Sequence, residues 1–324
     1  MFRPILFAFL SFLLFSCGKN AEEKTEDAIL SANISLSKSD CQAAITTLEE
    51  NGRVNNSAAY LKTLASAYAC RAGYSTTVFF SDDLSKAVSP APLGGTATFS
   101  TSQKTFQNPL QNDASFIDLQ TAIDILLYAG GISSTTEPTT TERKKYFSTL
   151  EVGDIDALLL YMEFVQLGRF FYVYGNSSAL GVKGGGNSGN NCLTSYSNAP
   201  APVKAALIAS GLTCNSINSS NAQLDGTLTA STRKTRLCQG VVLLNGVLAL
   251  LPSLVSSVLP ASQQDAANTA LDSVTTAKAL LVTLDPSIGQ VLTTQSQAAC
   301  EDDSIVSVSS LESYYAGLFE SVFE

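Results

Sequence analysis

Histidine is absent from the sequence, and its absence removes several kinds of chemistry. Histidine is the commonest general base in enzymes and the central member of the Ser-His-Asp arrangement, so neither is available here. The seven cysteines form no C-x-x-C pair, and without histidine the ligand spacing of a zinc site is missing as well. We therefore expect no bound metal ion and no cofactor.

Basic residues are also scarce. Lys and Arg number 19 against 28 Asp and Glu, which gives a formal net charge of −9. This balance argues against a nucleic-acid partner and against electrostatic docking on anionic lipid. Hydrophobic residues make up 45% of the chain and charged residues 15%, so the chain can bury a substantial core while its surface depends on Ser, Thr, Asn and Gln.

Two motifs that would indicate an enzyme are incomplete. Ser35–Lys38 and Ser231–Lys234 both match S-x-x-K, but neither is followed by S-D-N or K-T-G, so an acyl-enzyme mechanism is weakly supported. The glycine-rich stretch Gly181–Asn191 lacks the G-x-x-x-x-G-K-[ST] order of a phosphate-binding loop, and we interpret it as a flexible loop.

The first sixteen residues have the layout of a secretory signal. Arg3 is a lone positive charge, Ile5–Phe15 is apolar except for Ser11, and Ser16 is small. The apolar run is too short to span a bilayer as a mature helix. Removal of residues 1–16 removes Arg3 and changes the formal net charge from −9 to −10.

The tetrapeptide Leu14–Cys17 resembles the lipobox of bacterial lipoproteins. The resemblance implies that Cys17 carries acyl chains such as palmitate, that residues 1–16 are removed, and that the mature protein is anchored to the bilayer through its lipid. Gly18 and Lys19 follow without the Asp that often marks inner-membrane retention in that family. This implies the outer membrane, with the protein facing the periplasm or the cell exterior.

Six cysteines remain after Cys17, and an even number in an exported chain indicates disulfides rather than a metal site. Six cysteines allow 15 connectivities. Cys192 and Cys214 flank a short predicted helix, Pro202–Ser210, and could close a small loop. The pairing of Cys238 with Cys300 follows only by elimination, if the helices that carry and precede them form a hairpin.

The third pair comes from a predicted helical hairpin. Ser39 and Gln42 form a capping-box pattern at the start of the first helix, a turn covers residues 52–56, and Gly73 ends the second helix. Because two helices joined by a short turn run antiparallel, Cys41 at the first start and Cys70 near the second end are natural partners. Cys70 lies opposite Leu61 on its helix, so the leucine face must serve the remaining core.

The hairpin resembles part of a tetratricopeptide repeat. Asp40–Ile45 is similar to the start of that family's second helix, with Ala44 at the small packing position. The following helix is similar to its first helix at Leu61, Leu64, Ala65, Ala67 and Tyr68. The resemblance covers about one repeat period and implies hairpin geometry with a hint of peptide binding, whereas a stable array needs about three repeats.

The fold class predicted is all-α: an irregular helical bundle or solenoid-like array of helical hairpins with long polar loops, stapled by disulfides. We divide the chain into a signal (1–16), a lipidated tether (17–27), a tetratricopeptide-like hairpin (28–80), a flexible loop (81–112) and a helical domain (113–324). Capping patterns predict three further helices: one that begins with Ser115–Asp118 and stops at Gly130, one that opens at Ser262 and ends at Asp285, and a last one capped by Ser309–Glu312. Helices are also predicted at Glu142–Leu150, which is mostly polar, and at Asp154–Tyr174. Asp154–Tyr174 is apolar nearly all round and is taken as the central helix.

Two features leave alternatives open. Asp156 and Glu163 lie seven residues apart, on one side of the central helix, where they are either an acid/base pair or the strip that faces water. Val241–Leu259 has no charge and the length of a membrane span, but Asn245 and Pro252 favour a buried helix broken at Pro252.

The sequence therefore predicts a non-enzymatic, membrane-anchored lipoprotein that binds a protein or peptide of the bacterial envelope or acts as a scaffold. The alternative is a carboxylate-dependent envelope hydrolase that uses residues such as Asp156 and Glu163. A third possibility, a pore component, requires Val241–Leu259 to lie in lipid.

Overall fold

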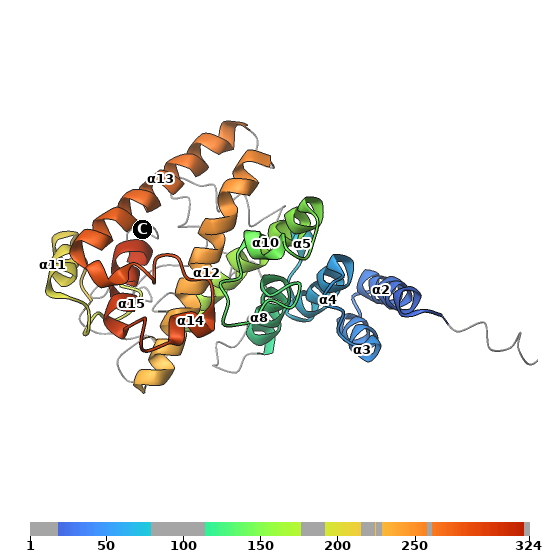
Figure 1. Ribbon diagram of the computed structural model, residues 1–324. Coiled ribbons are helices and arrows are strands. Elements are labelled where there is room, and N and C mark those ends of the chain that lie inside the picture. The colour runs from blue at the N-terminus through green and yellow to red at the C-terminus, as the bar shows by residue number, and fades with distance from the viewer. Residues whose placement is uncertain are drawn as a thin grey trace, which may run out of the picture.

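The computed structural model describes residues 19–78, 114–175, 192–214, 224, 229–257 and 261–320. Every regular element in these ranges is a helix, which confirms the all-α fold class. The N-terminal helices follow one another at one end of the molecule, and the C-terminal helices gather at the other, with α10 and α12 between them (Figure 1). Cys17, the loop at 81–112 and the loop at Gly181–Asn191 lie outside the described residues.

The first described helix, α2 (Ala21–Ser37), begins inside the stretch predicted to be a tether. Asn20 is its N-cap: the Asn20 side chain accepts from the N–H of Glu23, and the Glu23 carboxylate accepts from the N–H of Asn20. This capping box satisfies two donors that a helix start otherwise leaves free, so the polar, acidic sequence is helical from Ala21 onward rather than extended.

The hairpin of α3 (Cys41–Asn51) and α4 (Ala58–Arg71) is present, and Cys41 and Cys70 form a disulfide with 5.6 Å between their Cα atoms. The predicted cap is wrong by one residue. Asp40 caps α3 by accepting from the N–H of Ala43, while Ser39 adopts φ 60° in the preceding turn. Gln42 instead accepts a hydrogen bond from Arg71 at the end of α4.

The next helices correct two further predictions. α8 (Ala114–Leu127) contains Ser115 and Asp118 in its interior, where Asp118 forms an ion pair with Arg71 of α4 and does not serve as a cap. The prediction of a helix at Glu142–Leu150 is also wrong. This region contains a single helical turn, α9 (Thr140–Arg143), and then the start of the next helix. A short helix, α5 (Thr76–Val78), follows the hairpin.

The central helix is α10 (Thr149–Val173), which begins five residues before the predicted start because Ser148 and Glu151 form a capping box. Its apolar residues are buried on nearly all sides, as the sequence predicted. It packs against α4, α8 and α9, which belong to the N-terminal half of the chain, and against α12, which belongs to the C-terminal half. α10 therefore joins the two halves of the molecule.

The C-terminal half contains α11 (Ala201–Ala209), α12 (Ala230–Ser257), α13 (Ala261–Leu284), η3 (Pro286–Ile288), α14 (Gln297–Glu301) and α15 (Val308–Tyr314), which continues as a π-helical turn, η4 (Tyr315–Phe319). Ser307, not Ser309, caps α15. Cys300 lies in α14 rather than in a polar connection, and it is fully buried.

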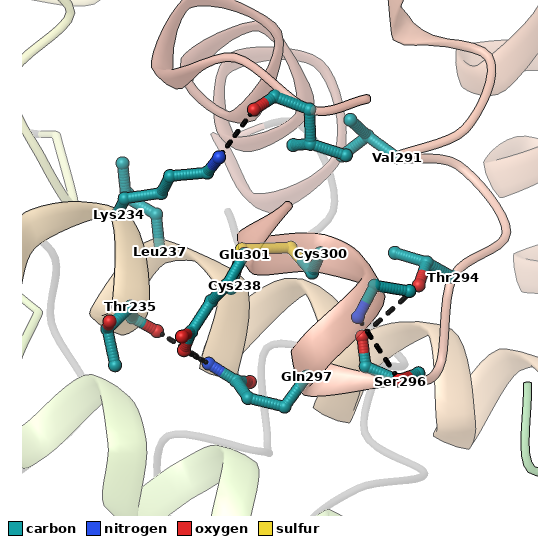
Figure 2. The surroundings of a disulfide bond; sticks show 12 residues. Lys234, Thr235, Leu237, Cys238, Val291, Thr294, Ser296, Gln297, Cys300 and Glu301 are labelled. Carbon is teal, nitrogen blue, oxygen red and sulfur yellow. Dashed lines mark hydrogen bonds between the residues drawn. A yellow bond between two sulfur atoms is a disulfide. The ribbon is translucent and has the colours of Figure 1, made fainter. Parts of the chain in front are cut away.

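Disulfides staple this half as the sequence predicted, with Cys192 bonded to Cys214 and Cys238 to Cys300. Figure 2 shows the second bridge between α12 and α14, with Gln297 donating to the carbonyl of Thr235 beside it. Residues 62 positions apart are thus held together by one covalent bond and one hydrogen bond.

Ala230–Pro252 of α12 is, among the described residues, the one helix long and apolar enough to cross a membrane. A core helix passes the same test of length and composition, and Val241, Leu244 and Val247 are buried. The prediction that this helix breaks at Pro252 is wrong, since α12 continues to Ser257 with Pro252 inside it.

Candidate functional site

The two carboxylates singled out from the sequence have different surroundings. Asp156 is 8% exposed and accepts hydrogen bonds from Nε of Arg143 at 2.8 Å and from the hydroxyl of Thr140 at 2.6 Å. Nη2 of Arg143 completes the ion pair at 2.7 Å from Oδ1. Arg143 is fully buried and also donates to the carbonyls of Leu127 and Pro138. The Arg143–Asp156 pair therefore fixes α9 on α10, and its hydrogen-bonding capacity is used for structure.

Glu163 is 2% exposed, and its Oε2 has no hydrogen-bond partner. Its carboxyl lies against Gly246 of α12, so close that a Cβ placed on Gly246 would be 2.7 Å from Cδ of Glu163. Burial holds the pKa of Glu163 well above its usual value, opposed by the nearby charge of Arg143 and supported by that of Asp156. Burial without a hydrogen-bond partner therefore favours the protonated, neutral form of this side chain.

These observations fit neither sequence interpretation of the pair. Both side chains are buried, so they do not form a strip that faces water. Seven residues correspond to about 10 Å along a helix axis, and Asp156 is committed to Arg143. The S-x-x-K lysine Lys234 is likewise committed, since it pairs with Asp303 and donates to the carbonyl of Val306.

The described residues instead form an apolar groove in the C-terminal half, which we call the α11–α13 groove. It has a volume of about 170 Å³. One wall is α11 and the opposite wall is α13, and each presents an i, i+3, i+4, i+7 stripe, the spacing that places side chains on one face of a helix. The groove is lined by Val203, Ala206, Leu207, Ser210, Leu212, Ala277, Leu280, Leu281, Leu284, Ala316, Gly317 and Glu320.

The end of the C-terminal helix forms the floor of this groove. Ala316 and Gly317 belong to η4 and Glu320 follows it. Gly317 lies so close to Leu281 of α13 that a Cβ would be 2.5 Å from Cδ1 of that leucine, so glycine at this position lets α13 approach. Leu280 stands on the rim and is 58% exposed.

Glu320 is the only charged residue that lines the groove, and it is 1% exposed. Its Oε1 accepts from the backbone N–H of Leu193 at 2.6 Å and from the hydroxyl of Tyr196 at 2.5 Å. Burial raises the pKa of Tyr196 well above its usual value, and the negative charge of Glu320 adds to the effect. Tyr196 thus remains a hydroxyl donor that holds the carboxylate in place.

A second buried carboxylate, two helical turns earlier, holds the same segment. Glu312 is fully buried and pairs with Arg233 of α12, while it accepts from the backbone and side-chain nitrogens of Asn198 at 2.7 and 2.9 Å. Arg233 also donates to the carbonyls of Ser195 and Leu224. Two carboxylates of one helix therefore fix residues 192–199, which lead directly into α11 and set the position of one groove wall.

The size and lining of the groove limit what it can hold. A cavity of about 150 Å³ lined by aliphatic side chains accommodates a benzene-sized group, so a volume of about 170 Å³ admits one large apolar side chain, or parts of two. Burying such a side chain contributes roughly 1.5–3 kcal/mol. The arrangement is suited to binding, and the lining residues include no pair of free acid and base groups.

Sequence analysis did not find this site. The helix at Pro202–Ser210 and the helix from Ser262 were predictable, but the groove arises from three segments about 40 to 110 residues apart in the chain. The six cysteines are structural, as predicted. No protein-family model, curated protein or solved structure matches the chain.

Proposed function

We propose that this chain is an exported lipoprotein, anchored through acylated Cys17, that binds an apolar segment of an envelope protein or peptide in the α11–α13 groove. The observation that carries the proposal is the open groove, with apolar walls from two helices and Leu280 exposed on its rim. The segment that fits is a helical or extended one with a large apolar side chain toward the groove. The partner's residues on either side of that side chain are neutral or basic, because the protein that carries the groove is strongly acidic.

The position of the groove relative to the proposed anchor supports this function. α2 begins at Ala21, only four residues after Cys17, so the lipid stays close to α2. Figure 1 places α2 at one end of the molecule and α11 and α13 at the other. An acyl anchor at Cys17 would therefore leave the helices that form the groove at the far end of the molecule from the attachment point.

The groove can be tested first with an uncharged apolar dye, N-phenyl-1-naphthylamine. We expect the wild-type protein to enhance its fluorescence and Ala277→Trp, which fills the groove, to abolish the enhancement. Ala59→Trp is the matched control, because Ala59 is exposed on α4, outside the groove. Equal binding by wild-type and Ala277→Trp proteins would contradict an open groove.

Partner binding can be tested with a photo-crosslinking amino acid in intact cells. At Leu280 we expect one defined crosslinked product that disappears when Ala277→Trp is combined with it. The control position is Leu150, which is 78% exposed but lies at the start of α10, outside the groove. Products of equal yield at both positions would indicate nonspecific contact and would overturn the proposal.

The anchor is tested separately by growth with labelled palmitate. We expect label in the wild-type protein and none in Cys17→Ser, whose mature chain should also keep residues 1–16. Label in both proteins, or a wild-type chain that begins at Met1, would exclude acylation at Cys17 while leaving the groove test unaffected.

A further inference from the structure

α10 of the N-terminal half packs on α12 of the C-terminal half, and this interface contains a buried carboxyl, that of Glu163. Glu163 of α10 packs against Gly246 of α12. Two helical turns later on α10, Phe170 packs against Gly240. Increasing residue numbers on α10 match decreasing numbers on α12, so the helices run antiparallel and each glycine receives one side chain of α10. The packing of Glu163 and Phe170 against these two glycines therefore holds the N-terminal half to the C-terminal half.

The described groups around Glu163 would not compensate a negative charge on its carboxyl. Oε2 is buried without a partner. The nearest cation, Arg143, is already bonded to Asp156 and to two backbone carbonyls. α12 contributes no charged side chain between Val241 and Ser257.

The other charged groups on elements that pack against α10 have partners of their own: Glu142 of α9 pairs with Lys145, and on α12 Arg233 pairs with Glu312, Lys234 pairs with Asp303 and Arg236 donates to Gln239. Asp118 of α8 pairs with Arg71, and Lys62 of α4 pairs with Asp154. Asp124 of α8 accepts from Gln120. Only Arg143 and Asp156 act electrostatically on Glu163, with opposite signs.

We propose that Glu163 is a proton-binding site that controls the packing of α10 on α12, so that loss of its proton at alkaline pH loosens the junction between the two halves. The protonated carboxyl packs against Gly246 as a neutral group. The carboxylate would place an uncompensated charge between two close helices, which must then separate or admit water. This inference is independent of the groove and of acylation.

The direction of the pH effect follows from the raised pKa of Glu163. A carboxyl whose pKa is higher in the folded than in the unfolded state stabilises the fold fully below the unfolded value, near 4.5. That contribution is lost progressively as pH rises toward the folded value. This loss of stability lowers Tm by roughly 2 °C per pH unit for a protein of this size.

A window from pH 6.5 to 9 lies above most of the described carboxyls and below the described tyrosines. Burial lowers the pKa of Lys278 toward this window, and that group is unchanged in the three proteins compared below. Desolvation by neighbouring side chains raises the pKa of Asp124 to about 6, although Asp124 keeps contact with solvent, so the last part of its titration falls in the lower end of this window and is common to the three proteins compared below. Hydrogen bonds from Ser148 and Ser304 lower the pKa values of Glu151 and Asp302, which titrate at still lower pH. The pKa values of Tyr68 and Tyr314 are raised above that of a free tyrosine, so both hydroxyls titrate above this window.

The test compares Tm at several pH values between 6.5 and 9 for wild-type protein, Glu163→Gln and the control Glu50→Gln, which changes an exposed carboxylate on α3. We expect Tm to fall with pH in the wild type and in Glu50→Gln and to stay nearly constant in Glu163→Gln. Equal slopes in all three proteins would overturn the proposal.

A second measurement does not depend on a folded variant. In wild-type protein labelled with 13C at the glutamate carboxyls, one resonance should titrate well above the rest, and amide exchange in residues 240–247 should accelerate over the same pH range after correction for the intrinsic rate. If all glutamates titrate near their ordinary value, or exchange in this stretch does not follow the titration, the proposal fails.

Discussion

At the scale of single residues, the molecule uses buried charges to fix segments that lack regular structure. Arg143, Arg233 and Glu312 are each almost completely buried. Each bonds to an opposite charge and to backbone groups of an irregular stretch. Such pairs contribute little compared with well-packed apolar residues, but removal of one partner leaves the other charge unpaired in the interior.

We therefore expect Glu312→Gln to lower the free energy of unfolding by about 3–5 kcal/mol, because Arg233 loses its counter-charge and Asn198 loses an acceptor. Denaturant unfolding followed by circular dichroism measures this loss. Lys62→Met serves as the control, since Lys62 and Asp154 form an exposed pair, 30% and 54% exposed, for which the cost is below about 1 kcal/mol. Similar costs for the two substitutions would show that the Arg233–Glu312 pair is not buried as described.

At the scale of elements, glycines decide how closely helices approach. A Cβ on Gly240 would lie 2.7 Å from Cε1 of Phe170 and closer still to the hydroxyl of Tyr315. By contrast, Gly153 lies inside α10 with no atom within 4 Å of the position its Cβ would take. The same substitution should therefore have opposite effects at the two positions.

We predict that Gly240→Ala destabilises the protein by about 1–3 kcal/mol through overpacking, whereas Gly153→Ala stabilises it by about 0.5–1 kcal/mol because alanine is the better helix former. Thermal unfolding of the two single variants and the wild type gives both signs in one experiment. Stabilisation by Gly240→Ala would mean that α12 and α10 are farther apart than described here.

Much of the element order was predictable, for identifiable reasons. The central helix was found because its apolar residues continue around the whole circumference, and the Cys41–Cys70 bridge because a short turn makes two helices antiparallel. The helix at Glu142–Leu150 was wrong because Ser148 and Glu151 form a capping box, and a cap at Ser148 starts a new helix where periodicity alone suggested a continuous one.

The groove was not predictable for a different reason. Its walls and floor are ordinary amphipathic stripes, each of which would also fit a closed core. Only the tertiary placement of α11, through the bonds of residues 192–199 to Glu312 and Glu320, leaves space between α11 and α13. A pattern of single residues does not contain that placement.

At the scale of the whole molecule, three disulfides divide the stabilisation between the halves, one in the α3–α4 hairpin and two in the C-terminal half. The loops that they close contain 29, 22 and 62 residues. In the chain-entropy model, closing loops of this size contributes about 3–4 kcal/mol each. The stability of both halves therefore depends on an oxidising environment.

Replacement of either cysteine pair by serine, Cys41/Cys70 or Cys238/Cys300, should lower the free energy of unfolding by about 3–4 kcal/mol. Mass spectrometry of a non-reduced digest should recover the three linked peptides from the wild type. A digest in which Cys41 is linked to any residue other than Cys70 would contradict the hairpin, and unchanged stability of the Cys238/Cys300 double variant would contradict a role for that bridge.

The hydrogen bonds of residues 192–199 also constrain the order in which the chain can fold. Leu193 and Tyr196 bond to a carboxylate 127 and 124 positions later, and Asn198 to one 114 positions later. Contacts over such distances form slowly, because a long loop must close before any bond repays it. Leu193, Tyr196 and Asn198 thus lack these carboxylate acceptors until Glu312 and Glu320 have been made, so the segment that positions α11 reaches its final place only after the helix that carries both carboxylates has docked.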